Sequence, residues 1–441
     1  MLFAKKNQFL NLFLLTIPSL VLFGISLKLT MLLWYPHGVN EKDLLLHIQL
    51  FSIIGLTWIA LYYGFDVLDL YTNRRPNQFI RALIGVHFIG LIVAIVFFYL
   101  QPNFLLTPRR FLFVDSLFAL LLSIVWQIII RSLTKNSARQ HVYLVNIEQT
   151  YSEQKQELSK QLPGYNIHFI TEKDLLSLTE KTHRSHQELL FVVPINPVFS
   201  AQTLELFAHL HAHGATFVQF DHFYETLFRR VLTTNLNDWW MLEHIQRDTI
   251  GLYPIVKRVL DILFALLIAI LFFLTFPFIA LLIKLSDQGK IFFTQTRLSV
   301  NGAPFTIYKY RTMRAGTPNN TWTADHDPRV TSVGRFLRTT RLDELPQWIN
   351  ILRGDMSLIG PRPEQAGIVE QLREEIPYFE SRHAIRPGLI GWAQLHVYAG
   401  TAAESKQKLQ YDLYYLKHRS FLFDVEILLK TIAHVFFLQG K

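Results

Sequence analysis

The stretch Ile262–Ile283 reads ILFALLIAILFFLTFPFIALLI and contains no Asp, Glu, Lys or Arg. It is long enough for a helix to reach across a hydrocarbon core about 30 Å thick. Pro277 lies inside the stretch, where a proline removes a helical hydrogen bond and kinks or breaks the helix. Thr275 is placed to bond a carbonyl group that the proline frees. The residues alone leave two topologies open: a kinked helix that crosses the membrane, or one that enters and returns on the same side.

Four more apolar stretches of similar length lie in the N-terminal third of the chain. Each carries at most one charged residue, and they are Phe9–Leu27, Leu44–Phe65, Ala82–Gln101 and Phe111–Ile130. Half of the 441 residues are hydrophobic and only 17% are charged, which disfavours a wholly soluble protein. The first stretch lacks a small-residue cleavage site, so we expect a retained span and not a signal peptide. We therefore predict a membrane anchor of four transmembrane helices over residues 1–135.

The charge balance points to anionic partners. Lys and Arg outnumber Asp and Glu by 43 to 34, a net charge of +9, which suits lipid headgroups, nucleotides or phosphates. No basic run, zinc-ligand spacing or RNA-binding aromatic pattern supports a nucleic-acid partner. The absence of cysteine from the sequence excludes disulfides, thiolate metal sites and a cysteine nucleophile. By the positive-inside rule, both ends of the anchor are cytoplasmic, because three basic clusters fall on one side of it: Lys5 and Lys6; Arg74, Arg75 and Arg81; Arg131, Lys135 and Arg139.

Residues 136–248 are predicted to form a small Rossmann-like α/β domain. Polar helical segments near Glu148–Gln161, Glu172–Lys181 and Ala201–His213 alternate with short apolar runs at His141–Val145, Asn166–Ile170, Leu189–Ile195 and Thr216–Phe220. This alternation indicates a parallel sheet. A dinucleotide site needs a glycine-rich turn after the first strand, but here the chain reads Val145-Asn146-Ile147-Glu148-Gln149. We therefore expect a degenerate domain with a structural or regulatory role.

The densest charged motif contains Asp343-Glu344-Leu345-Pro346-Gln347 and ends at Gly354. An amphipathic helix is expected there, with Pro346 in its first turn, because the apolar residues Leu345, Trp348, Ile349 and Leu352 have helical spacing. Asp343 and Glu344 then fall at the helix N-terminus, where the dipole favours carboxylates and bound anions. Six arginines and only three acidic residues lie between Arg329 and Arg362. A carboxylate kept ionised among arginines can attack a phosphate; the alternative is a helix-capping pair.

Other motifs surround this one in a fixed order. They are Phe292-Phe293-Thr294-Gln295-Thr296-Arg297, Lys309-Tyr310-Arg311-Thr312-Met313, Gly360-Pro361-Arg362-Pro363, Arg386-Pro387-Gly388-Leu389-Ile390-Gly391-Trp392-Ala393-Gln394 and Tyr411-Asp412-Leu413-Tyr414-Tyr415. Together with the Asp343-Glu344 motif, they resemble the bacterial polyprenyl-phosphate hexose-1-phosphate transferases that begin exopolysaccharide and O-antigen assembly. The resemblance covers about residues 250–441, and the preceding spans and α/β domain are similar to the large form of that family.

The resemblance implies a mainly α-helical catalytic domain over residues 249–441, at the cytoplasmic face of the bacterial inner membrane. It implies transfer of a sugar 1-phosphate from a UDP-sugar to undecaprenyl phosphate with release of UMP. Asp343 would be the nucleophile that forms a phosphosugar-enzyme, and Glu344 would help it hold Mg²⁺ or assist the second transfer. The segment Ile262–Ile283 would be a re-entrant helix broken at Pro277. Substrate phosphates or the lipid headgroup would be bound by Lys309, Arg311, Arg338, Arg341 and Arg362.

Two other functions stay open on the residues alone. One is a metal-dependent glycosyltransferase that uses the triplet Asp325-His326-Asp327 as its metal site. The other is a catalytically inert membrane scaffold of polysaccharide assembly. The segment Phe421–Leu438 is either a core helix or one that lies on the membrane, and His383 is interpreted as a polar surface or packing residue. A homodimer through the middle domain is a further hypothesis, and no motif identifies the sugar.

Overall fold

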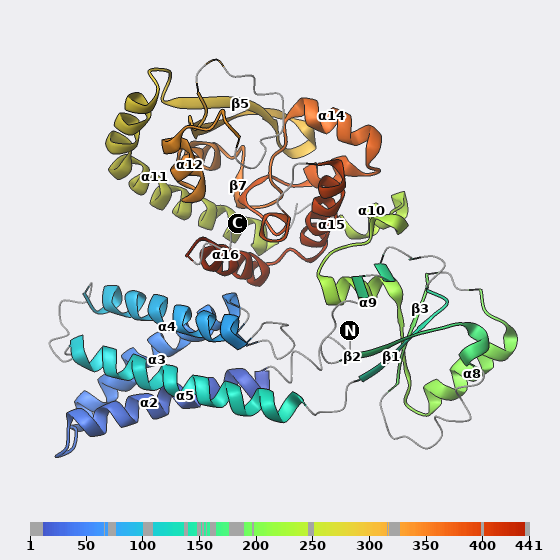
Figure 1. Ribbon diagram of the computed structural model, residues 1–441, viewed down its shortest axis with the longest axis horizontal. Coiled ribbons are helices and arrows are strands. Elements are labelled where there is room, and N and C mark those ends of the chain that lie inside the picture. The colour runs from blue at the N-terminus through green and yellow to red at the C-terminus, as the bar shows by residue number, and fades with distance from the viewer. Residues whose placement is uncertain are drawn as a thin grey trace. The chain divides into compact units, whose positions relative to one another are not determined.

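The computed structural model divides into two compact units, Met1–Thr226 and Leu227–Lys441 (Figure 1). The predicted boundaries at residues 135 and 248 stay predictions. The residues that the structure describes are 12–65, 67–68, 76–99, 109–135, 140–147, 151, 154–155, 157–158, 165–175, 189–195, 198–245, 251–314, 316, 327–397 and 401–436.

Four long apolar helices fill the first part of unit 1. A short π-helical turn, η1 (Leu12–Thr16), precedes them, and the helices are α2 (Ile17–Trp34), α3 (Glu41–Gly64), α4 (Pro76–Tyr99) and α5 (Arg109–Lys135). Each is long and apolar enough to cross a membrane. They pack side by side as Figure 1 shows, with α5 against α2 and α4. The four apolar stretches are thus confirmed as helices, except that residues 9–11, 100 and 101 lie outside the described residues.

Buried polar contacts join these helices. Ser26 Oγ donates to Asp115 Oδ1 at 2.9 Å between α2 and α5. Tyr62 of α3 lies 2.7 Å from His87 Nε2 of α4 and donates to Ser123 of α5 at 2.8 Å. Such bonds connect membrane helices where apolar burial alone gives little specificity.

The second part of unit 1 contains a four-stranded parallel sheet in the order β2-β1-β3-β4. The strands are β1 (Gln140–Val145), β2 (Tyr165–Ile170), β3 (Leu190–Val193) and β4 (Thr216–Gln219), and the helices are α8 (Ala201–Ala212) and α9 (Phe220–Phe228), whose last two residues belong to unit 2. All four predicted strands and the helix near residues 201–213 are confirmed. The predicted helices near 148–161 and 172–181 lie partly outside the described residues.

The turn after β1 replaces the glycine of a dinucleotide fold by asparagine. Asn146 has φ 53°, a left-handed conformation that asparagine tolerates better than most residues. Its side-chain Oδ1 accepts a hydrogen bond from the backbone of Glu172 at 3.1 Å. The side chain therefore ties this turn to the segment after β2.

Unit 2 contains the fifth apolar helix, α11 (Leu252–Ser286), which has 35 residues and continues through Pro277. Figure 1 shows that it bends along its length. The hydroxyl of Thr275 donates to Leu271 O at 2.8 Å. The carbonyl freed by Pro277 belongs to Phe273, four residues before it, so the expected role of Thr275 is wrong.

α11 contacts the rest of unit 2 at both ends. Near its start, Arg258 donates to Ile351 O at 2.7 Å, and Asp261 accepts from Leu358 N at 2.8 Å. Near its end, Ile283 is buried in one cluster with Leu337. The opposite face carries exposed apolar side chains, among them Leu263, Leu267, Ile270, Leu274, Phe278 and Leu285. One side of this helix therefore packs against the rest of unit 2, and the other presents apolar surface.

The remainder of unit 2 is predominantly helical, as predicted, with two small sheets that were not. One is the antiparallel pair β5 (Phe292–Leu298) and β6 (Pro304–Tyr310), and the other is the parallel pair β7 (Ser357–Ile359) and β8 (Gly388–Ile390). The helices and short 3-10 turns are η2 (Thr233–Asn235), α10 (Asp238–His244), η3 (Val300–Gly302), α12 (Ser332–Thr339), η4 (Leu342–Gln347), α13 (Trp348–Arg353), α14 (Ala366–Glu375), η5 (Phe379–Ala384), η6 (Ala393–Leu395), α15 (Ala402–His418) and α16 (Phe421–Phe436).

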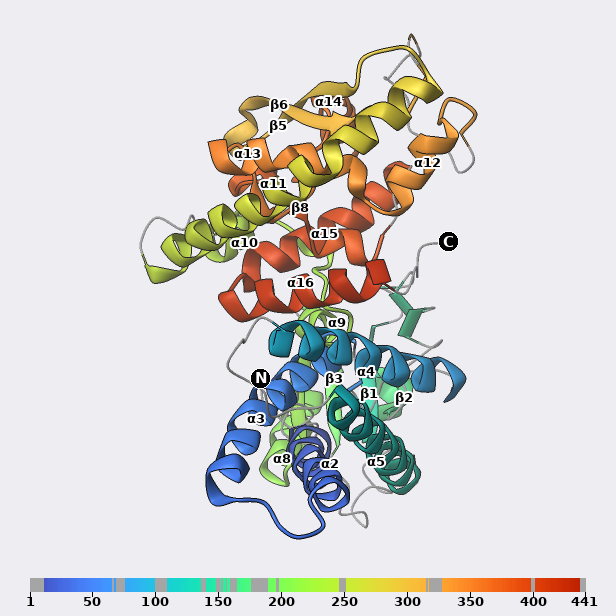
Figure 2. The same ribbon diagram turned by 90° about the vertical axis from the view of Figure 1, so that its left-hand side faces the viewer.

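Figure 2 shows α15 and α16 beside α11. Asp424 of α16 accepts from Lys257 of α11 at 2.8 Å and from Tyr415 of α15 at 2.7 Å. Phe423 and Ile427 are buried in the core, whereas Leu422 is 77% exposed. The segment predicted either as a core helix or as a membrane-surface helix therefore has a packed face and an exposed apolar residue at its start.

Candidate active site

A sharp turn brings Asp343 and Glu344 to the start of a helical segment. Arg341 has a left-handed backbone, with φ 58°, which reverses the chain between α12 and η4. Asp343 and Glu344 lie in the first turn of η4, as predicted, but the predicted amphipathic α-helix is 3-10 up to Gln347 and α-helical only from Trp348. Pro346 cannot donate a backbone hydrogen bond, and the α-helical pattern begins two residues after it.

The Asp343 carboxyl is buried, with 7% of the residue exposed. Its Oδ1 accepts no hydrogen bond from any residue that the structure describes. Burial, and then repulsion from Glu344, raise the pKa of Asp343 to about 6. Helix capping does not explain this side chain, since the cap position is Arg341 and no side-chain cap bond forms there among the described residues.

Glu344 is equally buried but is surrounded by cations. Its Oε1 lies 2.9 Å from Lys309 Nζ, 2.9 Å from Arg362 Nη2 and 3.9 Å from Arg341 Nη1. Burial alone raises its pKa, but Lys309, Arg362 and Arg341 together hold the pKa of Glu344 well below its usual range. The pair therefore contains one firmly ionised carboxylate, Glu344, and one whose pKa is raised to about 6, Asp343.

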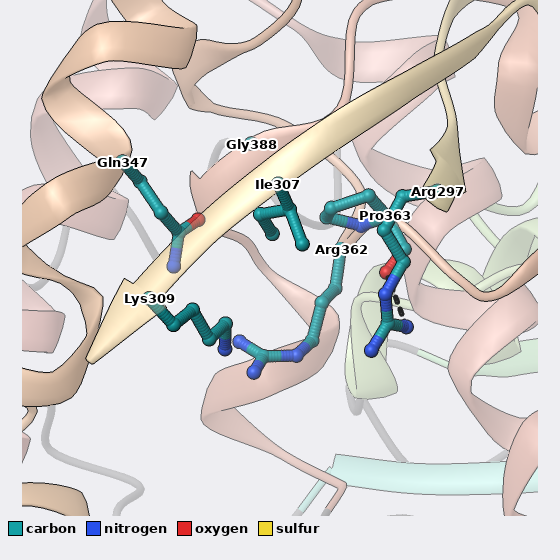
Figure 3. Close-up of a pocket in the computed structure, with 7 residues that line it drawn as sticks. All are labelled: Arg297, Ile307, Lys309, Gln347, Arg362, Pro363 and Gly388. Carbon is teal, nitrogen blue, oxygen red and sulfur yellow. Dashed lines mark hydrogen bonds between the residues drawn. The ribbon is translucent and has the colours of Figure 1, made fainter. Parts of the chain in front are cut away.

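Two of these cations, Lys309 and Arg362, line a hollow of about 220 Å³, a volume that includes open solvent (Figure 3). Figure 3 shows Lys309 and Arg362 pointing toward one another across it. Its lining residues come from β5, β6, η4, β8 and the loop after β7, and they are Arg297, Ile307, Lys309, Gln347, Arg362, Pro363 and Gly388. Three positive side chains beside two carboxylates make a surface that suits phosphate oxygens.

The structure brings together three of the five predicted phosphate-binding residues. Lys309, Arg341 and Arg362 all lie within 4 Å of Glu344. Arg338 donates instead to Thr312 Oγ1 at 2.9 Å. Arg311 donates to the backbone of Asp287 at 2.6 Å. The substrate roles of Arg338 and Arg311 stay predictions.

Sequence reasoning assigned no role to Arg297 and Gln347, which line the hollow. Part of this arrangement could have been predicted, because side chains two residues apart in a strand lie on the same face. Gln295 and Arg297 share one face of β5, and Arg297 Nη2 donates to Gln295 Oε1 at 2.7 Å. Ile307 and Lys309 share one face of β6 in the same way. The hairpin that places both faces at one hollow was not predicted, so the residues were not connected.

The two remaining predictions from polar residues have partial outcomes. In the triplet Asp325-His326-Asp327, the first two residues lie outside the described part, and Asp327 accepts from Arg329 at 2.6 Å. His383 is buried, with 8% exposed, and is a packing residue.

Replacement of Gly388 by alanine should deform this site. An added Cβ would lie 2.1 Å from Gly360 N and 2.6 Å from Gly360 O, so the loop that carries Arg362 must shift. We expect a loss of about 1–3 kcal/mol in the free energy of unfolding and a large loss of activity. The matched control is Gly367→Ala in α14, where nothing lies within 4 Å of the added Cβ. Thermal unfolding of both variants checks this; equal stability of the two would contradict the close approach.

Comparisons with known proteins are consistent with this geometry. A family profile described as bacterial sugar transferase matches residues 252–438. The chain is 42% identical over 203 residues to a UDP-N-acetylgalactosamine-undecaprenyl-phosphate N-acetylgalactosaminephosphotransferase of Aeromonas hydrophila, covering 44% of this chain and 48% of the relative. It is 40% identical over 187 residues to the UDP-glucose:undecaprenyl-phosphate glucose-1-phosphate transferase of Escherichia coli K12, covering 41% of this chain and 40% of the relative.

A protein of the same name from Caulobacter vibrioides is 42% identical over 181 residues. That match covers 40% of this chain and 68% of the relative. The chain thus matches most of this shorter relative, but less than half the length of the two longer ones. The matched residues include all of those that line the hollow.

Proposed function

We propose a function that follows from the family of this chain, which belongs to the bacterial sugar transferases. In this proposal, the chain transfers a sugar 1-phosphate from a UDP-sugar to undecaprenyl phosphate and releases UMP. This reaction would be the first membrane step of exopolysaccharide or O-antigen synthesis. The observation that carries the proposal is a buried aspartate with a free oxygen among the described residues, beside a glutamate fixed by two cations.

Asp343 is the nucleophile in this proposal. A carboxylate oxygen attacks the phosphorus next to the sugar, the bond to the bridging oxygen of the diphosphate breaks, and UMP leaves with that oxygen. A phosphate oxygen of undecaprenyl phosphate then attacks the same phosphorus, and the Asp343 carboxylate is released. The product joins sugar and polyprenol through a diphosphate.

Lys309 and Arg362 are proposed to hold the phosphate oxygens during both steps. They are fixed in place by Glu344 at 2.9 Å before substrate binds, so little reorganisation is needed as charge moves onto the leaving group. Arg341, which is nearly half exposed and 3.9 Å from Glu344, is the third cation available. A metal-dependent glycosyltransferase would instead break the bond between sugar and phosphate.

Mg²⁺ is the proposed cofactor, held by Asp343 and Glu344. The described residues contain no group of three or more metal-ligating side chains. Mg²⁺ is commonly bound by one or two carboxylates together with substrate phosphates and water, so a buried carboxylate pair with an unpaired Asp343 oxygen fits it. When bound there, the ion would neutralise charge on the diphosphate.

α11 is proposed to be re-entrant, and its contacts support this. Arg258 and Asp261 near one end and Ile283 near the other all pack on the same domain. A helix that crossed the membrane fully would place its ends on opposite sides. We therefore propose four spans, a Rossmann-like domain, and a re-entrant helix with the catalytic domain at the cytoplasmic face of the inner membrane.

This topology predicts a labelling pattern. A single cysteine placed at Gly316, in a chain without other cysteines, should be protected from a membrane-impermeant reagent in intact cells and labelled once the cells are opened. A cysteine at Gly38, in the loop between α2 and α3, is the matched external control. Labelling of residue 316 from outside would overturn the re-entrant topology.

The rate should fall at acidic pH because only ionised Asp343 attacks phosphorus. Burial and Glu344 raise the pKa of Asp343 to about 6, so protonation as the pH falls through this value removes the nucleophile. We expect kcat/KM to be flat above about pH 7 and to drop about tenfold per unit below about pH 5. A pH profile checks this, and an acid limb centred near the ordinary carboxyl value of roughly 4 would contradict it.

The direct test of the overall function is product identification. Purified enzyme is incubated with undecaprenyl phosphate and a panel that includes UDP-glucose and UDP-N-acetylgalactosamine, the donors for which two relatives are named. A lipid product that contains the sugar and two phosphates is expected. A product with no added phosphate, or none with any donor, would refute the proposal.

A further inference from the structure

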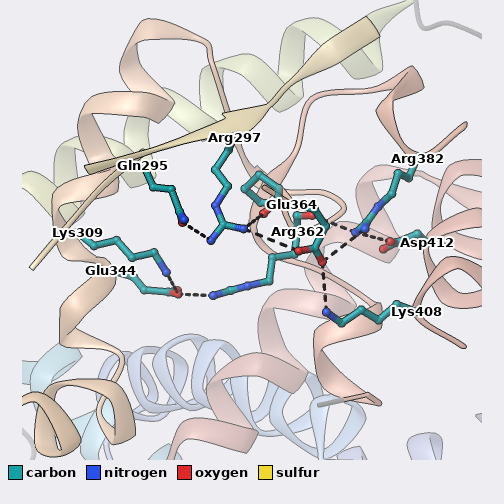
Figure 4. A network of polar contacts seen from close by, with 10 residues as sticks. Gln295, Arg297, Lys309, Glu344, Arg362, Glu364, Arg382, Lys408 and Asp412 are labelled. Atoms are coloured by element: carbon teal, nitrogen blue, oxygen red, sulfur yellow. Dashed lines mark hydrogen bonds and ion pairs between the residues drawn. The ribbon is translucent and has the colours of Figure 1, made fainter. Parts of the chain in front are cut away.

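A buried cluster of charges lies behind Arg362, on the side away from Glu344 (Figure 4). Its members are Glu364, Arg382, Lys408 and Asp412, which are 6%, 2%, 7% and 1% exposed. Charged side chains are seldom buried to this degree unless they are paired, because removal from water is costly. Packing alone therefore does not explain why these four charged side chains are buried.

The cluster contacts the segment that carries Arg362 through a hydrogen bond and ion pairs. Arg382 Nη2 donates to the backbone oxygen of Arg362 at 3.0 Å and lies 2.7 Å from Asp412 Oδ2. Glu364, two residues after Arg362, lies 3.5 Å from Arg382 Nη1 and 3.2 Å from Lys408 Nζ. Asp412 and Lys408 belong to α15 and Arg382 to η5, so two separate elements hold one short loop.

Arg362 extends in the opposite direction from this anchor. Its backbone is fixed by Arg382, while its guanidinium lies 2.9 Å from Glu344 and lines the hollow. Among the described residues, Arg382 and Asp412 neither line the hollow nor pair with Asp343 or Glu344. Arg382 reaches the lining of the hollow through the backbone of Arg362 and, through Glu364, also contacts Arg297 indirectly.

We propose that Asp412 and Arg382 are positioning residues, which hold the backbone of Arg362 so that its guanidinium meets the transferring phosphate. The inference rests on the proposed function in that Arg362 must contact the substrate. Asp412 fixes the direction of the Arg382 side chain, and Arg382 fixes the Arg362 carbonyl. Misplacement of a phosphate-binding group by about 1 Å can cost up to about 100-fold in rate. Loss of the Asp412 carboxylate should therefore lower the rate of transfer.

The kinetic test is a double-mutant cycle between Asp412 and Arg362. Asp412→Asn should lower kcat/KM for transfer to undecaprenyl phosphate about 10- to 100-fold in the wild-type background. If Asp412 acts through Arg362, the same change should cost little in an Arg362→Lys background, whose side chain already lacks the guanidinium fork. Equal losses in the two backgrounds would overturn the proposal.

The matched control is Asp424→Asn. Asp424 is also a buried aspartate paired with a cation, at 2.8 Å from Lys257, but it lies on α16 and, among the described residues, makes no direct polar contact with the Arg362 loop. Any loss of kcat/KM that Asp424→Asn causes should be the same in the wild-type and Arg362→Lys backgrounds. Thermal unfolding of each variant separates a shift in the site from a loss of folded protein.

A second measurement needs no turnover. Hydrogen–deuterium exchange of residues 360–365 should speed up in Asp412→Asn and in the milder Arg382→Lys, but not in Asp424→Asn. Wild-type exchange of this segment in both Asp412→Asn and Arg382→Lys would refute the positioning role, whatever the activity. A wild-type enzyme that transfers no sugar phosphate would refute the proposed function, while the exchange rates would still decide whether this cluster holds the loop.

Discussion

Replacement of Asp343 by asparagine should abolish transfer, with a loss of about 10⁴-fold or more in kcat. An amide has nearly the shape of a carboxyl but cannot attack phosphorus. The fold should survive, because at pH 7.5 the wild-type fold must keep a buried carboxyl ionised above its pKa of about 6, and a neutral amide avoids that cost. We therefore expect a Tm equal to or above that of the wild type, measured alongside kcat.

Asp238→Asn is the matched control for this variant. Asp238 is exposed at the start of α10, where it accepts a hydrogen bond from Tyr378 at 3.0 Å. Near-normal activity is expected. If Asp343→Asn kept a rate close to that of the control, Asp343 would not be the nucleophile.

Replacement of Arg362 by methionine should lower kcat/KM by about 10³-fold, within the range found when a guanidinium is removed from a transferring phosphoryl group. The variant would lose a proposed phosphate ligand and also leave Glu344 with one cation fewer at 2.9 Å. The kcat/KM of Arg362→Lys should lie between the values of the wild type and of Arg362→Met, because lysine keeps the charge but not the planar fork. Steady-state kinetics with saturating lipid acceptor give these values.

Arg373→Met provides the comparison for a surface arginine. Arg373 of α14 pairs with Glu380 at 2.6 Å, and both side chains are exposed to solvent. Such a pair contributes at most about 1 kcal/mol to stability, and neither residue lines the hollow. A loss in Arg362→Met no larger than in Arg373→Met would remove Arg362 from the substrate site.

Local patterns predicted the elements of this protein well. The apolar stretches became helices, and the four β-branched runs became the parallel strands, because burial of apolar side chains dominates both choices. The Asp343-Glu344 motif was placed correctly at the start of a helical segment. These outcomes depend on residues close together in sequence.

The same local patterns did not predict the tertiary arrangement of the site residues. The hairpin of β5 and β6 brings Arg297 to the hollow beside Lys309, and nothing local connects Arg297 with Arg362 more than sixty residues later. Arg311 follows Lys309 by two residues, yet it lies beyond the end of β6 and pairs with Asp287. Asp412 appeared only as part of a motif, since its partner Arg382 belongs to another element.

The central claim is a two-step transfer through Asp343, and isotope exchange tests it most directly. Purified enzyme is mixed with a UDP-sugar that it uses and with labelled UMP, in the absence of undecaprenyl phosphate. If Asp343 takes the sugar phosphate and releases UMP, the reverse of that step must carry label from UMP into the UDP-sugar, and Asp343→Asn must not. Release of UDP in the complete reaction, with no label entering the UDP-sugar when the lipid is omitted, would contradict the account.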